Sequence, residues 1–486
     1  MFYACALPIW EGFDEYAHYA RIEYLATEGH EPLRTTPVPA DIAETFSHAP
    51  LHNGGMATDQ YWKLSADERR RGFPVPGQTI YEAQQPPLFY WLMAPLYRSM
   101  RGISLAGELM AMRAVCVLLA SLLIPLGFLI ARRLCGGDLP AIGATALMAA
   151  LPVMTFTATH VGNEALAIPL GALVLYLTLR GRPVILAAVL GAALLTKAYF
   201  LLFLPPIAFT MLFRKTRRSA LIALAGAIAM GGWWYWLTWR ESGSLTGNII
   251  LAGSPGVQLW RLIPTVPWFQ AFDFASKTFV WIGNWSFIVL RTWMYRVVDM
   301  VALFASCGVA YRIWKREPGI ALCGAFVAVF TAGIAYFGLV SFATSGFPGA
   351  IAWYACCLSA PIAVLAFVGL RTVTPLKIRS AAGPFLVVLL AAFEMFGVNF
   401  LMLPYYGGII SHRPNGALPA CRLDQVMTGS RLMMERLTLY KPVWLTASVL
   451  LGLWMLYLTA TLALVAISIH MAVRETGKWK RLFNRS

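Results

Sequence analysis

The chain has 486 residues, of which 58% are hydrophobic and only 13% are charged. A soluble domain carries about 25% charged residues and rarely exposes large apolar patches, so this composition excludes a soluble globular protein. The formal net charge of +16 does not indicate nucleic-acid binding, because no basic stripe interleaved with aromatic residues is present.

The first apolar stretch ends near Trp10 and is shorter than the roughly 20 residues that span a bilayer. It lacks the basic region and the small-residue cleavage site of a signal peptide. We therefore expect either an abbreviated first helix or a true start upstream of Met1, and we favour the second. Apolar segments follow at residues 106–131, 139–158, 161–179, 183–196, 198–213, 219–239, 293–311, 319–342, 350–370, 380–403 and 443–472. Together these segments predict an all-α membrane protein of about 12 transmembrane helices.

Basic residues gather in alternate connections between these segments. They lie at residues 132–133, 180–182, 214–218, 312–316 and 371–379, and in a basic tail at 473–486. This face carries the whole formal charge of +16, so it must be cytoplasmic by the positive-inside rule. The predicted location is the cell inner (plasma) membrane, in several passes. Residues 1–472 form one transmembrane domain.

Three large connections then lie on the outer side, at residues 13–105, 240–292 and 404–442. In the first of them, residues 14–29 predict a helix on which Asp14, His18 and Arg21 share one face. A carboxylate at the membrane boundary is partly desolvated, which raises its basicity and suits a general base. The alternative is an ordinary helix start with acidic residues near its positive end.

The stretch YEAQQPPLFYWLMAPLY, residues 81–97, follows in the same connection. Pro86 and Pro87 can open a helix, and its uncharged aromatic residues are typical of a helix in the interface plane. Glu82 and Gln85 are thereby held at the level of Asp14. An ordinary amphipathic loop helix is the alternative.

These motifs resemble those of the GT-C superfamily of membrane glycosyltransferases. The branch that uses polyprenyl-phosphate sugars, with protein mannosyltransferases and aminoarabinose transferases, is the most similar. The resemblance runs in order over residues 8–290. Its motifs are GFDEYAHYARI (12–22), YEAQQPPLFYWL (81–92), ATHVGNEALAIPLGALVLYLTL (158–179), LLTKAYFLLFLPP (194–206), GGWWYWLTWRESGSLTG (231–247) and SKTFVWIGNWSF (276–287). This chain departs from the family at Gln85, where a His is usual, and at Ala352, where many members have Arg.

The resemblance implies an inverting glycosyltransferase with its site on the extracytoplasmic side. It implies a polyprenyl-phosphate-linked sugar as donor and a glycan, lipid or protein as acceptor. Asp14 would activate the acceptor, with Glu15 as the second catalytic candidate. The candidate substrate-binding residues are His18, Glu82, Gln85, Asn163, Lys197, Arg113 and Arg291.

Each candidate cation also has a plainer interpretation. Lys197 suits a leaving phosphate, because charges inside a membrane tend to be functional, but a snorkelling Lys is possible. Arg113 could bind phosphate or pair with Glu108. Arg291 could instead anchor its helix at the interface.

A divalent cation (Mg, Mn or Zn) is a possible cofactor, with Glu82, His160 and Glu164 as ligands of suitable chemistry. The rival function is a multi-pass transporter or a flippase for lipid-linked saccharides. Against it, there is no inverted repeat, and the charged residues lie at the outer interface, where a transporter would have its site at the midplane. Convergence of Asp14, Glu82 and Lys197 on one outer cavity would favour the transferase.

Overall fold

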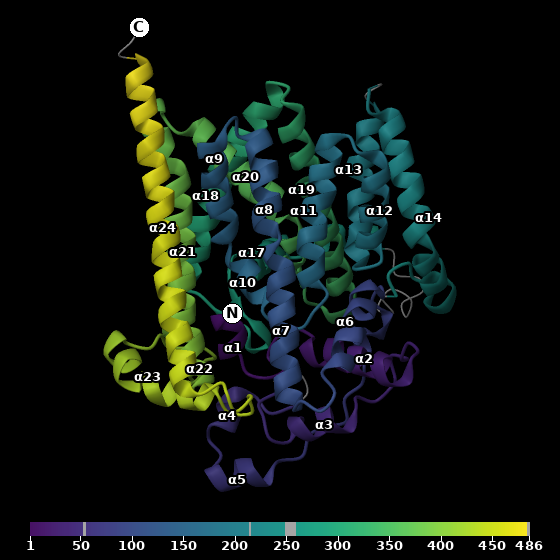
Figure 1. Ribbon diagram of the computed structural model, residues 1–486, viewed down its shortest axis with the longest axis vertical. Helices are drawn as coiled ribbons and strands as arrows, with labels where there is room; N and C mark the ends of the chain where they lie inside the picture. The colour runs from purple at the N-terminus through teal and green to yellow at the C-terminus, as the bar shows by residue number, and fades with distance from the viewer. Residues whose placement is uncertain (52–54, 213–214, 248–258, 484–486) are drawn as a thin grey trace.

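The computed structural model describes residues 1–486 except 52–54, 213–214, 248–258 and 484–486, and it describes no side chains beyond residue 476. The described chain is a bundle of upright helices that is capped at one end by shorter helices (Figure 1). The bundle contains α7 Leu105–Ser121, α8 Leu123–Leu134, α9 Asp138–Ala149, α10 Pro152–Ala158, α11 Glu164–Arg180, α12 Pro183–Leu194, α13 Leu204–Phe209, α14 Arg217–Ser242, α18 Thr292–Trp314, α19 Pro318–Ser345, α20 Ser359–Val373, α21 Ala382–Phe396 and α24 Ala447–Phe483.

Short elements connect these helices or precede them. They are α1 Phe2–Ala6, α2 Glu15–Glu28, α3 Ala40–Phe46, α4 Thr58–Tyr61, α5 Ala66–Arg71, η1 Tyr81–Gln84, α6 Leu88–Ser99, η2 Ala198–Phe203, η3 Thr210–Leu212, α16 Leu259–Leu262, η4 Ile263–Thr265, α17 Trp268–Val280, η5 Asn284–Ser286, η6 Trp353–Leu358, η7 Leu376–Ala381, η8 Gly397–Met402, α22 Leu403–Tyr406 and α23 Leu423–Leu437. The strands β1 Ile282–Gly283 and β2 Ile288–Val289 form an antiparallel pair.

The predicted all-α membrane fold is confirmed. Among the described residues, seven helices are long and apolar enough to cross a membrane, and α9 with α10, bent by 51°, makes an eighth if it counts as one span. The other predicted segments fold as shorter helices. α12 has 12 residues, and the segment 198–212 is divided between η2, α13 and η3. Pro205 and Pro206 lie in that divided segment, and proline cannot donate a helical hydrogen bond.

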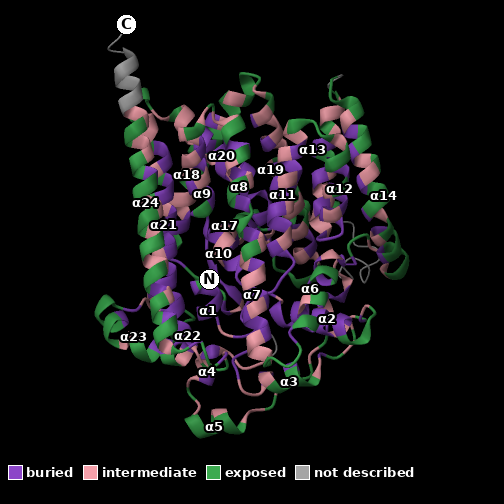
Figure 2. Ribbon diagram, viewed as in Figure 1, coloured by how far each residue is buried: buried purple, intermediate pink, exposed green. Residues whose placement is uncertain are grey.

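The outward faces of the bundle are apolar. Figure 2 shows exposed residues along α14 and α24, and these include Trp236 and Leu462, which are 56% and 67% exposed. Water would not favour such a surface, whereas hydrocarbon chains accept it. The apolar residues of these segments therefore lie on the outer faces of the bundle as well as in its packed interior.

The basic connections gather at one end of the bundle, as the charge pattern predicts. The start of α14 and the C-terminal end of α24 both lie at the top in Figure 1. Arg371, in the last turn of α20, donates two hydrogen bonds to Glu475 of α24, at 2.8 and 2.5 Å. The tail is a continuation of α24 as far as Phe483.

The first large connection packs back onto the bundle at the opposite end. Its α2 and α6 lie side by side at the predicted positions, below the membrane-length helices in Figure 1. The backbone N–H of Leu88, at the start of α6, donates to the carbonyl of Leu195 at the end of α12. This packing excludes a detached arm and places the two acidic stretches against the helix ends.

Candidate active site

Asp14 stands at the turn where the chain enters α2. It adopts a left-handed conformation with φ of 56°, which is uncommon for a residue with a side chain. Gly12 just before it lies against His160, since an added Cβ would lie 2.3 Å from the His160 Cβ. A glycine is therefore needed for this turn to pass so close to the bundle.

The Asp14 carboxylate accepts a hydrogen bond from Tyr81, with 2.6 Å between the Tyr81 hydroxyl and Asp14 Oδ1. Burial raises the pKa of Asp14, and the Tyr81 hydrogen bond lowers it in part. Burial also raises the pKa of Tyr81 well above its ordinary value, so Tyr81 stays protonated and is the donor. Asp14 is thus a desolvated carboxylate with a raised affinity for a proton, as a general base requires.

Lys197 lies at the junction between α12 and η2. Its Nζ is 2.6 Å from Asn163 Oδ1 and 2.5 Å from Glu164 Oε1. Asn163 in turn donates to the Thr196 carbonyl at 3.3 Å, which fixes the amide. An ammonium group has three donors, and these two contacts occupy two of them. Lys197 also lines a cavity, so the third donor is available to a ligand.

The cavity beside Lys197 has a volume of about 500 Å³. Its polar end is formed by Lys197 together with Tyr81, Glu82, Gln84 and Gln85. Its apolar end lies between η2 and α19 and is lined by Leu201, Leu202, Phe330, Ile334 and Phe337. Asp14 is one hydrogen bond away from this lining, through Tyr81. Of the three residues predicted to converge on one cavity, Glu82 and Lys197 line it, and Asp14 lies behind Tyr81 and does not line it.

Two side chains of the polar end have buried oxygens without a partner. Glu82 Oε2 and Gln84 Oε1 accept no hydrogen bond from the described residues. Burial, followed by the charge of Asp14, raises the pKa of Glu82 to about 8. Glu82 is thus largely protonated at neutral pH and can donate a hydrogen bond into the cavity. Buried polar atoms usually have partners, so this end is suited to a polar ligand.

Arg113 and Glu15 form a closed pair and do not belong to the cavity. Arg113 donates to both Glu15 oxygens, at 2.7 and 2.6 Å, and its remaining donors reach the carbonyls of Ala4, Leu7 and Pro8. The predicted pairing of Arg113 with Glu108 is wrong, because Glu108 accepts from the Tyr19 hydroxyl. No donor of Arg113 is left for a phosphate.

Glu15 is correspondingly unsuited to catalysis. Burial would raise the pKa of Glu15, but Arg113 outweighs this effect and the pKa is lowered. One of its oxygens also accepts from the Val161 N–H at 3.0 Å. Glu15 therefore ties α2 to the bundle, and the prediction of Glu15 as a second catalytic residue has no support in this geometry.

His18 and Arg21 face the same side as Asp14, as their spacing predicts. His18 Nδ1 lies 2.8 Å from the Tyr90 hydroxyl. Arg21 donates to the carbonyls of Glu82 and Gln85, at 2.9 and 2.8 Å. Burial, followed by the charge of Lys197, lowers the pKa of His18 well below its ordinary value, so His18 is neutral. Arg21 thus holds the YEAQQPP stretch in place, and His18 contacts α6 just after it.

Arg291 lies away from the cavity. It precedes α18 and donates to the Leu418 carbonyl at 3.4 Å. This position separates Arg291 from the other predicted substrate-binding residues and agrees with an anchoring role.

The predicted metal ligands do not assemble. No group of three or more His, Cys, Asp or Glu side chains with metal-binding geometry occurs in the part of the chain that the structure describes. The Nδ1 of His160 is engaged by the Phe156 carbonyl at 3.0 Å, and Glu164 is paired with Lys197. Glu82, His160 and Glu164 therefore do not fit a divalent cation as one ligand set.

Sequence reasoning did not propose several polar residues that line the cavity, among them Arg34, Tyr199 and Tyr354. Arg34 donates to the Gly247 carbonyl at 3.2 Å, across two outer connections that no local pattern relates. The Tyr354 ring lies 5.6 Å from Lys197 Nζ. Tyr354 belongs to the stretch that departs from the family motif, so its place at the cavity had no signal in spacing.

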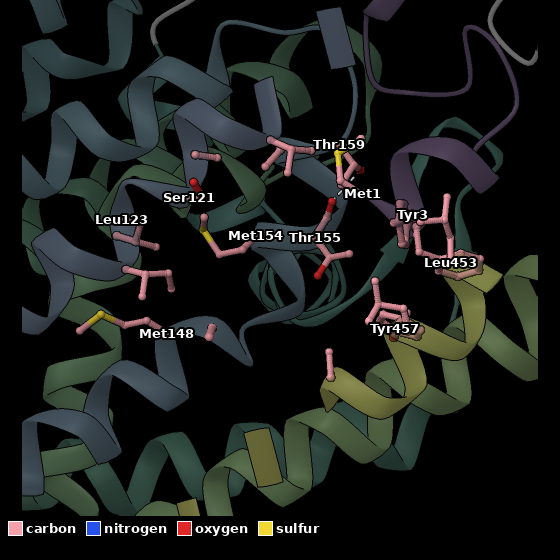
Figure 3. A pocket seen from close by; sticks show the side chains of 18 residues that line it. Met1, Tyr3, Ser121, Leu123, Met148, Met154, Thr155, Thr159, Leu453 and Tyr457 are labelled. Carbon is pink, nitrogen blue, oxygen red and sulfur yellow. Dashed lines mark hydrogen bonds between the residues drawn. The ribbon is translucent and has the colours of Figure 1, made fainter. Parts of the chain in front are cut away.

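A second cavity of about 410 Å³ is lined by residues of α1, α7, α8, α9, α10 and α24. Figure 3 shows Tyr3, Met154 and Tyr457 around it. Its lining has no charged side chain, so the cavity beside Lys197 is the better candidate for chemistry.

The fold and the site define a multi-pass helical membrane protein with a charged cavity at the end of the bundle opposite its basic connections. No family model and no curated protein matches the chain. Among solved structures, two of ArnT from Cupriavidus metallidurans are similar to it, each at 15% identity and a TM-score of 0.45. The match to the structure bound to undecaprenyl phosphate covers 96% of this chain and 72% of that one, and the match to the apo structure covers 98% and 73%.

Proposed function

We propose that this protein is a membrane glycosyltransferase that moves a sugar from a polyprenyl-phosphate donor to an acceptor on the outer side of the membrane. The observation that carries the proposal is the two-ended cavity. Its polar end has a free donor on Lys197 and a neutral acid at Glu82, and its apolar end runs between η2 and α19. A polyprenyl-phosphate donor also has two parts, a charged phosphate and a long hydrocarbon chain, and these match the polar and the apolar end of the cavity.

Asp14 is the proposed general base. An acceptor hydroxyl or amine attacks the anomeric carbon while the bond from that carbon to the phosphate oxygen breaks, and the configuration inverts. Asp14 takes the proton of the acceptor, and the electron pair of the broken bond stays on the phosphate. Tyr81 orients Asp14 through its 2.6 Å hydrogen bond.

Lys197 is the proposed stabiliser of the leaving phosphate. A point charge that is already fixed by Asn163 and Glu164 needs no reorganisation as negative charge develops. The neutral Glu82 adds a hydrogen bond without adding repulsion. Gln85 is a further proposed contact at the polar end, and His18, which does not line the cavity, positions α6 through Tyr90.

The outer location is part of the proposal. The basic connections lie at the other end of the bundle (Figure 1), and an excess of Lys and Arg marks the cytoplasmic side. The cavity then opens toward the extracytoplasmic side.

The test is a transfer assay with purified protein and radiolabelled polyprenyl-phosphate sugars, followed by release of free polyprenyl phosphate. Asp14→Asn keeps the shape of the side chain but cannot take a proton, and loss of a general base costs about 10²–10⁴-fold in rate. Glu28→Gln, at the exposed end of the same helix, is the control and should keep full activity. Transfer by Asp14→Asn at more than about a tenth of the wild-type rate, well above that range, would remove Asp14 from the mechanism. A flippase would bind the donor and release no polyprenyl phosphate.

A further inference from the structure

A third cavity lies at the basic end of the bundle, away from the proposed active site. It has a volume of about 540 Å³ and is bounded by the ends of α8, α18 and α20 and by η7. Three arginines line it, namely Arg312, Arg371 and Arg379. Such a concentration of guanidinium groups around one hollow is a binding arrangement for a phosphate, which Arg contacts through two parallel hydrogen bonds.

The three arginines are not equally neutralised. Arg371 is paired with Glu475 and Arg312 with Glu317, at 2.5 and 2.7 Å. Arg379 has no carboxylate within ion-pair distance in the described chain, and its Nε is buried without a hydrogen-bond partner there. Within the part of the chain that the structure describes, Arg379 is therefore the one arginine of the cavity without a carboxylate partner.

The cavity lies at the depth of lipid headgroups. Arg312 is near the end of α18, a helix of 23 residues, which spans about 35 Å at 1.5 Å per residue. That length crosses the hydrocarbon core of roughly 30 Å, so a cavity at the helix end meets the headgroup layer. Phe367, Val368 and Val373 also line it and are compatible with the glycerol and the first methylenes of a lipid.

We propose that this cavity binds the phosphate group of an anionic phospholipid from the cytoplasmic leaflet. Basic pockets between transmembrane helices on the cytoplasmic side bind the headgroups of anionic lipids in other membrane proteins. Arg379 supplies a guanidinium that has no carboxylate partner among the described residues. Arg312 and Arg371, which their carboxylates hold in place, donate further hydrogen bonds to the phosphate. The bound lipid would join α18, α20 and η7 at a point where the residues that line the cavity carry a net positive charge.

The test uses the full chain in nanodiscs of neutral phosphatidylcholine with increasing phosphatidylglycerol, and measures lipid retention by native mass spectrometry. Wild type should retain phosphatidylglycerol with saturation, and Arg379→Gln should need about tenfold more of it, since one charged hydrogen-bonding partner is lost. Lys377→Gln is the matched control, because Lys377 lies in the same η7, is exposed and does not line the cavity. Its retention should equal that of wild type.

Two further measurements complete the test. The first decides whether the bound phosphate belongs to a lipid or is free inorganic phosphate, and the second decides whether Arg379→Gln weakens lipid binding or destabilises the fold. Inorganic phosphate should not displace the retained lipid, and saturable displacement by phosphate alone would assign the cavity to the free anion and overturn the lipid source. The melting temperature of Arg379→Gln in phosphatidylcholine should equal that of wild type. If Arg379→Gln melts early, Arg379→Lys, which keeps the charge but loses the planar fork, takes its place and should retain less lipid than wild type. Equal retention of both lipids by wild type, or the same loss in Lys377→Gln, would overturn the proposal.

Discussion

Two buried ion pairs lie close to the end of the bundle opposite its basic connections, and they differ in how many hydrogen-bond donors of the cation they leave unoccupied. In the first, Arg113 meets Glu15 at 2.6 Å, and both side chains are fully buried. In the second, Lys197 Nζ lies 2.5 Å from Glu164 Oε1, and each of the two side chains is 8% exposed. The first pair has every guanidinium donor occupied, whereas the second pair has a donor that faces a cavity.

The comparison separates a cation that holds the fold from a cation that can hold a ligand. Intramembrane charges are costly and therefore tend to be functional, but that rule does not distinguish Arg113 from Lys197. The count of unoccupied donors does. Arg113 joins α7 to the carbonyls that precede Asp14, so its function is to position the segment that carries Asp14.

Arg113→Met should have the largest effect on stability. The substitution leaves the Glu15 carboxylate buried without a cation, and breaking a buried pair in this way costs about 3–5 kcal/mol. Thermal unfolding in detergent should show a large fall in the melting temperature. Arg291→Met removes an exposed Arg that has one long hydrogen bond and is the control. A melting temperature of Arg113→Met equal to that of the control would contradict the structural role of the pair.

Glu82→Gln should change the pH dependence of transfer. The pKa of Glu82 is about 8 because burial, and then the charge of Asp14, favour the protonated form. As pH rises through that value, Glu82 becomes negative and repels the donor phosphate, so wild-type kcat/KM should fall by up to about tenfold per pH unit. An amide cannot ionise, so the variant should keep its activity above pH 8. An unchanged alkaline fall in Glu82→Gln would mean that another group titrates there.

Tyr81→Phe should have a smaller effect on the acidic side of the same profile. The Tyr81 hydrogen bond lowers the pKa of Asp14, so its removal should move the acidic limb of kcat/KM to higher pH. The expected shift is up to about one pH unit, since a hydrogen bond to a charged group contributes about 1.5 kcal/mol. Tyr176→Phe, which loses a contact with Arg180 at 3.0 Å, is the control. A shift of equal size in both variants would remove Tyr81 from the positioning of Asp14.

Much of the fold could be predicted because it depends on local patterns. The lengths of the apolar segments predicted the helices, and the alternation of basic connections predicted their common end. The order of the motifs predicted that Glu82 and Lys197 share one cavity, whereas Asp14 lies behind Tyr81. The partner of Arg113 could not be predicted, because Glu15 lies 98 residues away in the chain while Glu108 is a near neighbour on the same helix. The place of Arg34 at the cavity depends on the packing of two outer connections, which has no periodic signal.

The most direct test of the account is the affinity of the protein for polyprenyl phosphate, the proposed leaving product, in Lys197→Met compared with Arg291→Met. Both substitutions remove one positive charge, but only Lys197 lines the cavity. Loss of a charged hydrogen bond of about 1.5–3 kcal/mol predicts that Lys197→Met binds at least about tenfold more weakly, while Arg291→Met binds as wild type does. Titration of each purified variant in nanodiscs measures both values. Equal affinities in the two variants would contradict the assignment of this cavity to the phosphate of the donor.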